Sequence, residues 1–383
     1  MKRDIKNILK ILFRYSTDNT DDKPSSEILP CLKNISSFLK RKRVYCGLQE
    51  YKVFSEDDQP MIHANLLAFN PELKGPFVLF QGHIDTVPFI PPYNFELRSN
   101  TLKGRGAVDM KGSLAGMISA FIDLYKKSKS FKYPPMLLIT GDEEACAFAG
   151  IKTFLERNRL PIFLAINGES TNFKVGTKFL GVLAYNLERK GKGGHSSSID
   201  NDYLIEKLIP TLESINDFLA KSRKVFDKSF GKTIGAFTVV KSGKKDNQLP
   251  EDFRASWNLR TVKDRGVYDK IFKDTIEKRI DVKTKIKSFC YEPTKIDIPM
   301  GIKKALKYAF EKTGIGYKES AVNFFTEASL INQIGILTVV CGPGNPTLAH
   351  VEPKKEVIKI NNIVKYSKLL QNIVKEFNKR LDD

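Results

Sequence analysis

The sequence predicts an α/β protein in which a mostly parallel sheet, flanked by helices, is interrupted by an inserted α+β domain. Two observations predict this fold class. Short apolar runs typical of buried strands alternate with helical segments in the first and last parts of the 383-residue chain. Residues 177–293 instead carry runs in which apolar and polar residues alternate, as in a strand with one exposed face. We therefore expect one domain formed by residues 1–176 and 294–383, with the insert as a second domain.

Three short apolar runs in the first part of the chain are the expected strands of the parallel sheet. They are PFVLFQ at residues 76–81, PMLLIT at 135–140 and PIFLAIN at 161–167. Helices are expected from residue 111, where apolar residues recur at helical spacing, and from about residue 151. Because strands that alternate with helices pair in parallel, these helices should cover both faces of the sheet. Residues 1–75 should add helices and short strands.

The insert should contain half-exposed strands and one helix, which is expected at about 201–222. Its strands are expected in GVLAYNLERKGKGGHSS at 181–197, TIGAFTVVKSG at 233–243 and FRASWNLRTV at 253–262. After residue 294 the pattern returns to a helix (301–314), a strand (336–343) and a long closing helix after Glu352. This return places the last part of the chain in the same domain as the first.

The composition is typical of a globular protein, with 41% hydrophobic and 28% charged residues. No apolar stretch approaches the ~20 residues that cross a bilayer, so no membrane association is expected. The basic, amphipathic N-terminus lacks a cleavage pattern and is expected to form a first helix rather than a signal peptide. The five scattered cysteines, without a CxxC pair, indicate neither a disulfide framework nor a zinc finger. A cytoplasmic location follows as the expectation.

The chain is strongly basic, with 63 Lys and Arg against 44 Asp and Glu and a formal net charge of +19. Such an excess can indicate nucleic-acid binding. The charge is spread along the chain, however, and its densest spots are only KRKR at 40–43 and KSGKK at 241–245. A lysine-rich solvated surface is the favoured interpretation, and we expect no nucleic-acid partner. A positive field that attracts a small anionic substrate is the remaining alternative.

Acidic and histidine residues follow the ends of the expected strands in an ordered series. They are His83 and Asp85 after the first strand, Asp109 before the next helix, Glu143 and Glu144 after the second strand, Glu169 after the third, and His350 after the last. Binding sites in open α/β sheets form at the carboxyl ends of the strands. Taken singly, each residue has an ordinary explanation, such as a helix cap at Asp109, a solvated turn at Glu143 and Glu144, or a loop histidine at position 350.

Clustered carboxylates repel one another and therefore need a cation. Mixed histidine and carboxylate ligands suit zinc, and cobalt or manganese also fit. Two histidines and three carboxylates are too many for one tetrahedral zinc ion. They suit two ions that share one carboxylate and a water molecule.

Six motifs now resemble a known family in order and spacing. They are GHIDTVP (82–88), GRGAVDMKG (104–112), GDEEACAFAG (141–150), GEST (168–171), GGHSS (193–197) and LAH (348–350). They resemble the dinuclear zinc amidohydrolases and exopeptidases that include acetylornithine deacetylase, succinyl-diaminopimelate desuccinylase, aminoacylase and glutamate carboxypeptidase. The resemblance spans nearly the whole chain and implies a zinc-exopeptidase-like catalytic domain with an inserted lid and dimerisation domain.

The resemblance implies a role for each motif residue. His83, Glu169 and the bridging Asp109 would form one metal site, and Glu144, His350 and Asp109 would form the second. Asp85 would be the carboxylate that orients His83, and Glu143 would be the general base. In the insert, His195 would polarise the scissile carbonyl from the other subunit of a homodimer. Asn247 and Arg260 would hold the carboxylate of the substrate, a role for which a guanidinium is well suited. His63 has no motif and is expected to be structural.

The resemblance implies a zinc-dependent hydrolase that cleaves the amide of a small N-acyl amino acid. The expected reaction is deacetylation of N-acetylornithine in arginine biosynthesis, because FFTEAS (324–329) resembles acetylornithine deacetylase more than the desuccinylase. Glu327 in this stretch would attract the substrate ammonium, although a helix cap explains it almost as well. Alternatives are the desuccinylase, a carrier-linked lysine or ornithine deacylase, and a dipeptidase or carboxypeptidase. A metal-binding protein without catalysis is the alternative of a different class, and the presence of Glu143 argues against it.

Overall fold

The computed structural model describes residues 1–20, 23–55, 58–89, 95–197, 204–280 and 285–381, which form two compact units. The large unit comprises Met1–Thr177, Ile296–Ser320 and Thr326–Asp383, and the small unit comprises Lys178–Lys295 and Ala321–Phe325. Each unit has its own apolar core. The predicted insert thus makes up most of the small unit, while the division of roles between a catalytic domain and a lid stays a prediction.

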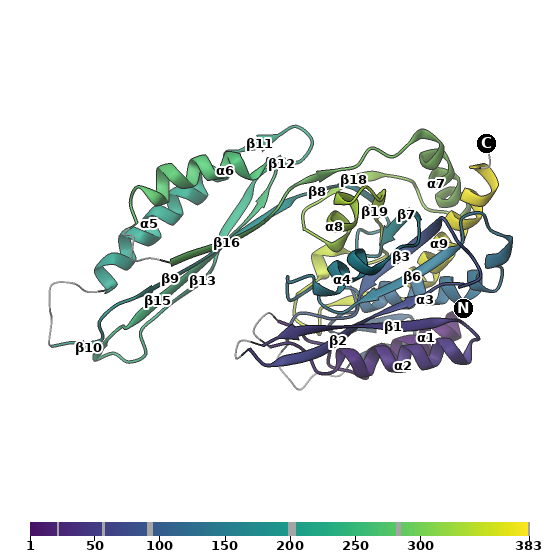
Figure 1. Ribbon diagram of the computed structural model, residues 1–383, viewed down its shortest axis with the longest axis horizontal. Coiled ribbons are helices and arrows are strands. Elements are labelled where there is room, and N and C mark those ends of the chain that lie inside the picture. The colour runs from purple at the N-terminus through teal and green to yellow at the C-terminus, as the bar shows by residue number, and fades with distance from the viewer. Residues whose placement is uncertain (21–22, 56–57, 90–94, 198–203, 281–284, 382–383) are drawn as a thin grey trace. The chain divides into compact units, whose positions relative to one another are not determined.

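The main sheet has a parallel centre and antiparallel edges (Figure 1). Its strands, in spatial order, are β1 (Cys46–Phe54), β2 (Pro60–Ala68), β6 (Pro135–Thr140), β3 (Phe77–His83), β7 (Ile162–Asn167), β19 (Thr338–Val340), β8 (Val175–Phe179) and β17 (Thr294–Lys295), with β18 (Glu319–Val322) paired to β8. β3 pairs in parallel with β6 and β7, and β19 pairs in parallel with β7. The predicted fold class, a largely parallel sheet flanked by helices, is confirmed.

Every residue of β3 and β6 is buried, which explains their continuous apolar sequence. The expected strand at 76–81 differs from β3 in one respect that matters for the site. Gly82 and His83 do not follow the strand but belong to it, because their backbones continue to pair with Ile139 and Thr140 of β6. The imidazole of His83 is therefore held by strand backbone and not by a loop.

Helices cover both faces of the sheet (Figure 1). One connected layer consists of α1 (Lys2–Leu12), α2 (Ile28–Arg41), α3 (Lys111–Tyr125), α7 (Met300–Lys312) and α9 (Ile360–Arg380). α4 (Ala149–Arg157) and α8 (Glu327–Gln333) contact each other on the opposite face. α3 is buried along almost its whole length, since it lies between the sheet and both α1 and α9. Its apolar residues therefore surround the helix rather than form one stripe.

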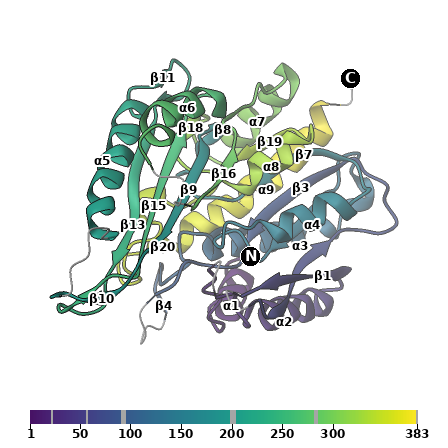
Figure 2. The ribbon, with the colours of Figure 1, turned by 60° about the vertical axis from the view of Figure 1, so that its left-hand side comes forward.

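The small unit is an α+β structure whose antiparallel sheet is covered on one face by helices (Figure 2). The strands, in order, are β13 (Ile234–Ser242), β15 (Asp252–Thr261), β9 (Gly181–Lys190) and β16 (Lys285–Tyr291), and the helices are α5 (Leu204–Ser222) and α6 (Arg265–Phe272), the latter continued by a π-helical turn (Lys273–Glu277). Trp257 stacks on Tyr185 at 5.0 Å between ring centroids, and Tyr185 in turn stacks on Phe272 at 4.9 Å. These rings form the centre of the second core.

Short elements complete the described structure. They are a sheet of β20 (Val357–Lys359), β5 (Thr101–Lys103) and β4 (Glu96–Arg98), the pair β10 (Gly194–His195) and β14 (Gln248–Leu249), the pair β11 (Phe226–Asp227) and β12 (Gly231–Lys232), and 3₁₀ turns at Ser128–Ser130 and Pro346–Leu348. Among the described residues, no helix combines the length and apolar character that a membrane span requires.

Replacing Phe218 by alanine should destabilise the small unit. Phe218 is fully buried on α5 and packs edge-on against Tyr185, with 5.6 Å between ring centroids. Loss of a buried phenylalanine side chain lowers the free energy of unfolding by about 3–5 kcal/mol. Trp257, the one tryptophan of the chain, lies in the same core, so its fluorescence during urea denaturation measures the change. Ile209 lies on the same helix, and its side chain is 60% exposed, so Ile209→Ala should change the free energy of unfolding by less than about 0.5 kcal/mol. An equal loss of stability in both variants would contradict the packing of Phe218 in the core.

Candidate metal centre

Carboxylate and imidazole side chains gather at the carboxyl ends of the parallel strands. They come from His83 at the end of β3, Glu143 and Glu144 after β6, Glu169 after β7, His350 after β19 and Asp109 before α3. Parallel strands end at the same edge of their sheet, which is why segments so distant in the sequence meet there. The structure thus brings together every residue that the sequence proposed as a metal ligand.

A glycine lets the segment after β19 approach this edge closely. A Cβ atom at Gly342 would lie 2.3 Å from the carbonyl oxygen of Gly168 and 2.4 Å from that of Glu169. Any side chain at position 342 would therefore displace backbone. The loop that leads to His350 can pack against the Glu169 turn only because residue 342 is a glycine.

Asp109 offers one carboxylate oxygen to each of two histidines. His83 Nε2 lies 3.1 Å from Asp109 Oδ1, whereas His350 Nε2 lies 3.1 Å from Asp109 Oδ2. A second carboxylate completes each side. Glu169 Oε1 is 3.0 Å from His83 Nε2, and Glu144 Oε1 is 3.2 Å from His350 Nε2. The cluster thus has two halves that share Asp109, as a bridging ligand requires.

Glu143 lies within the same cluster. Potential ligand atoms of His83, Glu143 and Glu169 all lie within 4.8 Å of one another, and so do those of His83, Asp109 and Glu144. The two groups overlap at His83, so the cluster is continuous. Glu143 is therefore close enough to a reacting group at this site to exchange a proton with it.

Asp85 fixes the orientation of the His83 ring. His83 Nδ1 lies 3.0 Å from the backbone oxygen of Asp85 and 3.3 Å from its Oδ1. These acceptors place the proton of a neutral ring on Nδ1, which turns the lone pair of Nε2 towards the cluster. The other oxygen, Asp85 Oδ2, accepts hydrogen bonds from the backbone of Glu144 (2.9 Å) and from Asn19 Nδ2 (3.1 Å). Asp85 therefore positions ligand segments of both halves.

The clustered side chains strongly alter one another's pKa values. Burial, reinforced by the charge of Asp109, raises the pKa of the Glu169 carboxyl to about 8. Burial also raises the pKa of Glu143 well above its usual range. Burial lowers the pKa of His350, but hydrogen bonds to Asp109 and Glu144 outweigh it and raise that pKa to about 11. The carboxylates thus favour positive charge at their centre.

The donor set fits two divalent metal ions. His83, Glu169 and Asp109 would hold one ion, and His350, Glu144 and Asp109 would hold the other. Imidazole nitrogens and carboxylate oxygens are ligands that zinc accepts, and cobalt and manganese suit them as well. Two divalent ions would also balance the charge of the four clustered carboxylates, which explains why so many acidic groups are tolerated in a buried site.

Several residues that support the site left no clear sequence signal. Glu356 is fully buried and accepts hydrogen bonds from the backbone of Val108 (3.0 Å) and Asp109 (3.3 Å) and from Arg105 Nη1 (2.7 Å). It holds the turn that carries Asp109 from a position 247 residues further along the chain. Asn19, which contacts Asp85, belongs to no motif either. A hydrogen bond between distant segments produces no periodic pattern in the sequence.

In the small unit, His195 and Asn247 lie beside each other. His195 pairs with Gln248 between β10 and β14, and the next residue, Ser196, donates its backbone N–H to the oxygen of Asn247 (3.0 Å). Both His195 and Asn247 are exposed. Arg260 is half-buried near the far end of β15, so the length of that strand separates it from Asn247. Within this unit the structure groups two of the three predicted residues. Their roles stay predictions.

Glu327, the first residue of α8, is fully buried. Its carboxylate accepts hydrogen bonds from Thr140 Oγ1 (2.7 Å) and from Gln81 Nε2. Burial raises the pKa of this carboxyl to about 7. The expected contact with a substrate ammonium stays a prediction, and the contacts that the structure provides are with protein donors. His63, expected to be structural, is buried as well, with Nε2 3.0 Å from the backbone oxygen of Ser25.

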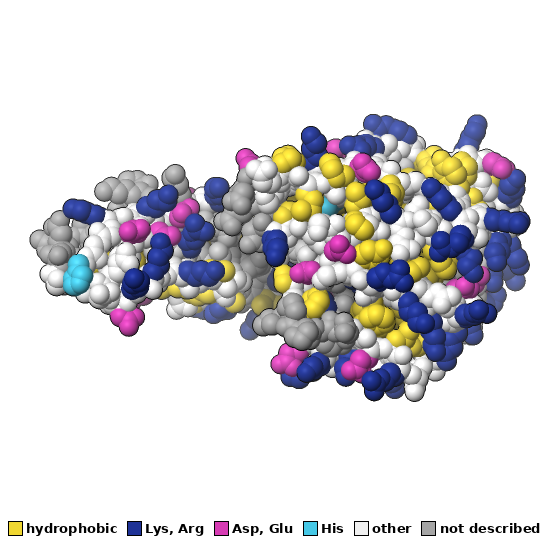
Figure 3. All heavy atoms as spheres, turned by 90° about the horizontal axis from the view of Figure 1, so that it is seen from below, with side chains coloured by type: hydrophobic (Ala, Val, Ile, Leu, Met, Phe, Trp, Pro, Cys, Tyr) yellow, Lys and Arg dark blue, Asp and Glu magenta, His cyan; other side chains and the backbone are white. Residues whose placement is uncertain are grey.

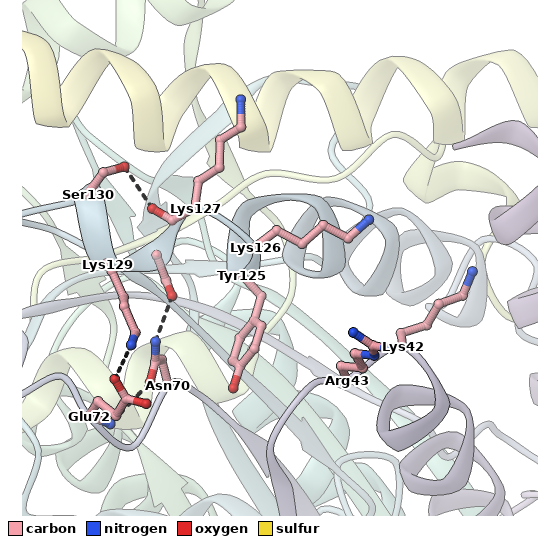
Figure 4. A pocket seen from close by; sticks show the side chains of 10 residues that line it. Lys42, Arg43, Asn70, Glu72, Tyr125, Lys126, Lys127, Lys129 and Ser130 are labelled. Carbon is pink, nitrogen blue, oxygen red and sulfur yellow. Dashed lines mark hydrogen bonds and ion pairs between the residues drawn. The ribbon is translucent and has the colours of Figure 1, made fainter.

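A separate pocket of about 670 Å³ in the large unit has a strongly basic lining (Figure 4). Its cationic side chains are those of Lys42, Arg43, Lys126, Lys127 and Lys129. Glu72 pairs with Lys129, and Asn70 donates to Ser128 Oγ (3.0 Å). Asn70 and Glu72 precede β3, and Ser128 precedes β6, so the pocket lies near the amino-terminal ends of the parallel strands. The candidate metal ligands lie at the opposite, carboxyl-terminal ends of these strands.

On the face that Figure 3 shows, Lys and Arg side chains are spread over the surface, with Asp and Glu between them. The expectation that no nucleic acid binds stays a prediction.

The model of peptidase family M20/M25/M40 matches residues 79–376, a range that contains both halves of the cluster. The chain belongs to this family. The predicted family and the prediction of a hydrolytic enzyme are thereby confirmed. One structurally similar member of the family, the YXEP protein of Bacillus subtilis, is described as a dinuclear metal binding peptidase; its TM-score is 0.62 and its identity is 12%, with coverage of 99% of this chain and 100% of that chain.

Two curated M20 relatives cover most of the chain. Acetylornithine deacetylase of Buchnera aphidicola subsp. Schizaphis graminum is 26% identical over 328 residues, which are 82% of this chain and 84% of the relative. A LysW-lysine/LysW-ornithine hydrolase of Pyrobaculum aerophilum is 26% identical over 302 residues, which are 79% and 82% of the two chains. The structure resembles that of an M20 family metallo-carboxypeptidase from Sulfolobus solfataricus, with a TM-score of 0.77, 15% identity and coverage of 99% of this chain and 100% of that chain. At that identity the resemblance concerns the fold.

Metal content should fall stepwise when the ligands are removed. The wild-type protein should bind two divalent ions per chain, as expected for a dinuclear site. His350→Ala removes a ligand of one ion and should leave about one, whereas Asp109→Ala removes the shared ligand and should leave almost none. Elemental analysis after dialysis measures the ratio. His195→Ala, in the small unit, is the control and should retain both ions. Equal metal content in the Asp109 and His350 variants would show that Asp109 does not bridge.

Proposed function

We propose that this M20 enzyme hydrolyses the amide bond of an N-acyl amino acid, and that its substrate is N-acetylornithine, with ornithine and acetate as products. The observation that carries the proposal is Asp109, whose two carboxylate oxygens face His83 and His350. A carboxylate shared in this way suits a dinuclear hydrolase, which adds water to an unreactive carbonyl. The match to an acetylornithine deacetylase over most of both chains supports the choice of substrate.

In this proposal Glu143 carries the proton. Two divalent ions bound at the cluster would polarise the scissile carbonyl and lower the pKa of a water molecule towards about 7. Glu143 takes a proton from a water molecule at the site, whose oxygen forms a bond to the amide carbon. Glu143 then gives the proton to the amide nitrogen as the C–N bond breaks, so that the products are a carboxylic acid and an amine. The position of Glu143 among His83 and Glu169 supports this role.

His195 is proposed to donate a hydrogen bond to the oxyanion that forms on the carbonyl oxygen. The backbone N–H of Ser197 donates to His195 Nδ1 (3.3 Å). A neutral ring that accepts at Nδ1 carries its proton on Nε2, and this N–H is available because the side chain is exposed. Such a donor contributes strongly to catalysis, since it meets charge that develops only in the transition state. We propose that His195 and the adjacent Asn247 act on the site of a second copy in a homodimer.

Arg260 is proposed to bind the carboxylate of the amino-acid part of the substrate. A guanidinium forms two parallel hydrogen bonds with a carboxylate, which fixes orientation as well as affinity. The alternative substrates keep this carboxylate. They are N-succinyl-diaminopimelate, a carrier-linked lysine or ornithine, and a peptide with a free C-terminus. The LysW-lysine/LysW-ornithine hydrolase relative favours the carrier-linked substrate among them.

Amine release from a substrate panel tests the proposed reaction. N-acetylornithine, N-succinyl-diaminopimelate, other N-acyl amino acids and dipeptides would be compared with added zinc or cobalt and with a chelator. N-acetylornithine should be hydrolysed fastest, and chelation should abolish the reaction. Glu143→Gln keeps the shape of the side chain but removes the base, so kcat should fall by about 10²–10⁴-fold with both metal ions retained. Full activity of Glu143→Gln would refute the assignment of the base.

Complementation between two inactive variants tests the role of His195 across a dimer. His195→Ala and Glu143→Gln should each have little activity alone. If His195 acts on the partner copy, a mixed dimer has one complete site, and co-refolded equal mixtures should recover about a quarter of the wild-type activity. A mixture of Glu143→Gln with Glu144→Gln provides the control. Because both changes lie in the large unit, no mixed dimer has a complete site, and this mixture should recover much less activity. Failure of the His195 mixture to gain activity would contradict action across a dimer.

A further inference from the structure

A buried carboxylate beneath the metal centre has no role in the proposed reaction. Glu327 is fully buried, and it accepts hydrogen bonds from Gln81 Nε2 and Thr140 Oγ1. Both of these donors are neutral groups, and within the described structure the second carboxylate oxygen of Glu327, Oε1, is buried without a hydrogen-bond partner. A carboxylate in such surroundings is costly to bury. The contacts that the Glu327 carboxylate makes with its neighbours should therefore explain why it is buried there.

Glu327 ends a chain of hydrogen bonds that begins at a candidate metal ligand. The backbone N–H of Glu169 donates to Asn167 Oδ1 (3.1 Å). Asn167 Nδ2 donates to Gln81 Oε1 (2.6 Å), and Gln81 Nε2 donates to Glu327. All four side chains are buried. The chain crosses from β7 to β3 and then to the start of α8, so it connects the strand ends that carry Glu169 and His83.

The direction of each hydrogen bond in this chain is fixed by the previous one. Because Asn167 accepts from Glu169 with its oxygen, its amide group must face Gln81. Gln81 must then accept with its oxygen and donate with its own amide, whose described acceptors are Glu327 and, at 3.3 Å, Thr140 Oγ1. Alanine at position 327 would leave Gln81 Nε2 with only the longer contact to Thr140 Oγ1 among the described residues. Glutamine at position 327 would still offer an oxygen.

We propose that Glu327 is a positioning residue, which acts through Gln81 and Asn167 to hold Glu169 in place as a metal ligand. The inference rests on the proposed function only in that Glu169 binds a metal ion. It rests on the protein contacts of Glu327 and is separate from the predicted contact with a substrate ammonium. Removing the acceptor should allow the Gln81 and Asn167 amides to rotate, and Glu169 with them.

Metal affinity, measured without any substrate, tests this proposal. Full-length wild-type protein, Glu327→Ala and Glu327→Gln would be titrated with Zn²⁺ against a competing chelator, and with Co²⁺, whose absorption spectrum reports ligand geometry. Loss of a residue that orients a metal ligand lowers metal affinity by about 10–100-fold. Glu327→Ala should show such a loss for one of the two ions together with an altered Co²⁺ spectrum. Glu327→Gln, which keeps the acceptor, should restore the affinity to within a few-fold of wild type.

Ser329→Ala is the matched control. Ser329 lies on the same helix and is equally buried, but its hydroxyl has no hydrogen-bond partner in the described structure. This variant should retain both ions with wild-type affinity. Circular dichroism and thermal unfolding of each variant establish that it is folded before titration.

Gln81→Met provides an independent test, including the case in which Glu327→Ala does not fold. It removes the middle of the chain while keeping the size of the side chain, and it should weaken the same ion. If Glu327 acts through Gln81, the double variant that combines Glu327→Ala with Gln81→Met should bind this ion no more weakly than the single variant with the lower metal affinity. Wild-type affinity in Glu327→Ala or in Gln81→Met would overturn the proposal, as would Glu327→Gln as defective as Glu327→Ala. A wild-type enzyme that binds two ions but hydrolyses no member of the panel would refute the substrate and leave this inference intact.

Discussion

The site depends on one carboxylate that is shared between two imidazoles. Asp109 turns one oxygen towards His83 and the other towards His350, so both halves of the cluster depend on this residue. Buried carboxylates in this number repel one another, and positive charge between them is what makes the arrangement stable. The parallel sheet brings the ligand segments to one edge, and Asp85 and Glu356 hold those segments by their backbones.

Much of this arrangement could be predicted from the sequence, because both its strands and its motifs are local. PMLLIT coincides with β6 at 135–140, and the ligand residues after β6 and β7 follow those strands as expected, whereas His83 is the last residue of β3 itself. Glu356 and Asn19 could not be found in this way, since each contacts the site from a distant segment. Gln81 and Asn167 carry a weak signal. Each stands two residues before a ligand, and residues two apart on a strand share one face. Burial of Glu327 could not be read from its motif, because the same letters fit an exposed helix start.

The small unit was predictable as a class of structure but not in its details. Alternating residues in β9 and β15 predict half-exposed strands, whereas the pairing of His195 with Gln248 depends on a register set across 53 positions of the chain. Sequence patterns contain no information about such a register when both segments are short. The stack of Tyr185 on Trp257 likewise joins residues on neighbouring strands, and it emerges only when the sheet is assembled.

The fixed direction of the hydrogen bonds from Glu169 to Glu327 also limits how this protein can evolve. An amide in such a chain has one accepting and one donating end, so Asn167 changed to Asp, or Gln81 changed to Glu, would set two acceptors against each other. A single change of this kind at position 81 or 167 is therefore harmful, whereas position 327 requires only an acceptor. Lineages that descend from a common ancestor would change residues 81 and 167 in concert or inherit them unchanged, and residue 327 would vary only among side chains that offer an acceptor.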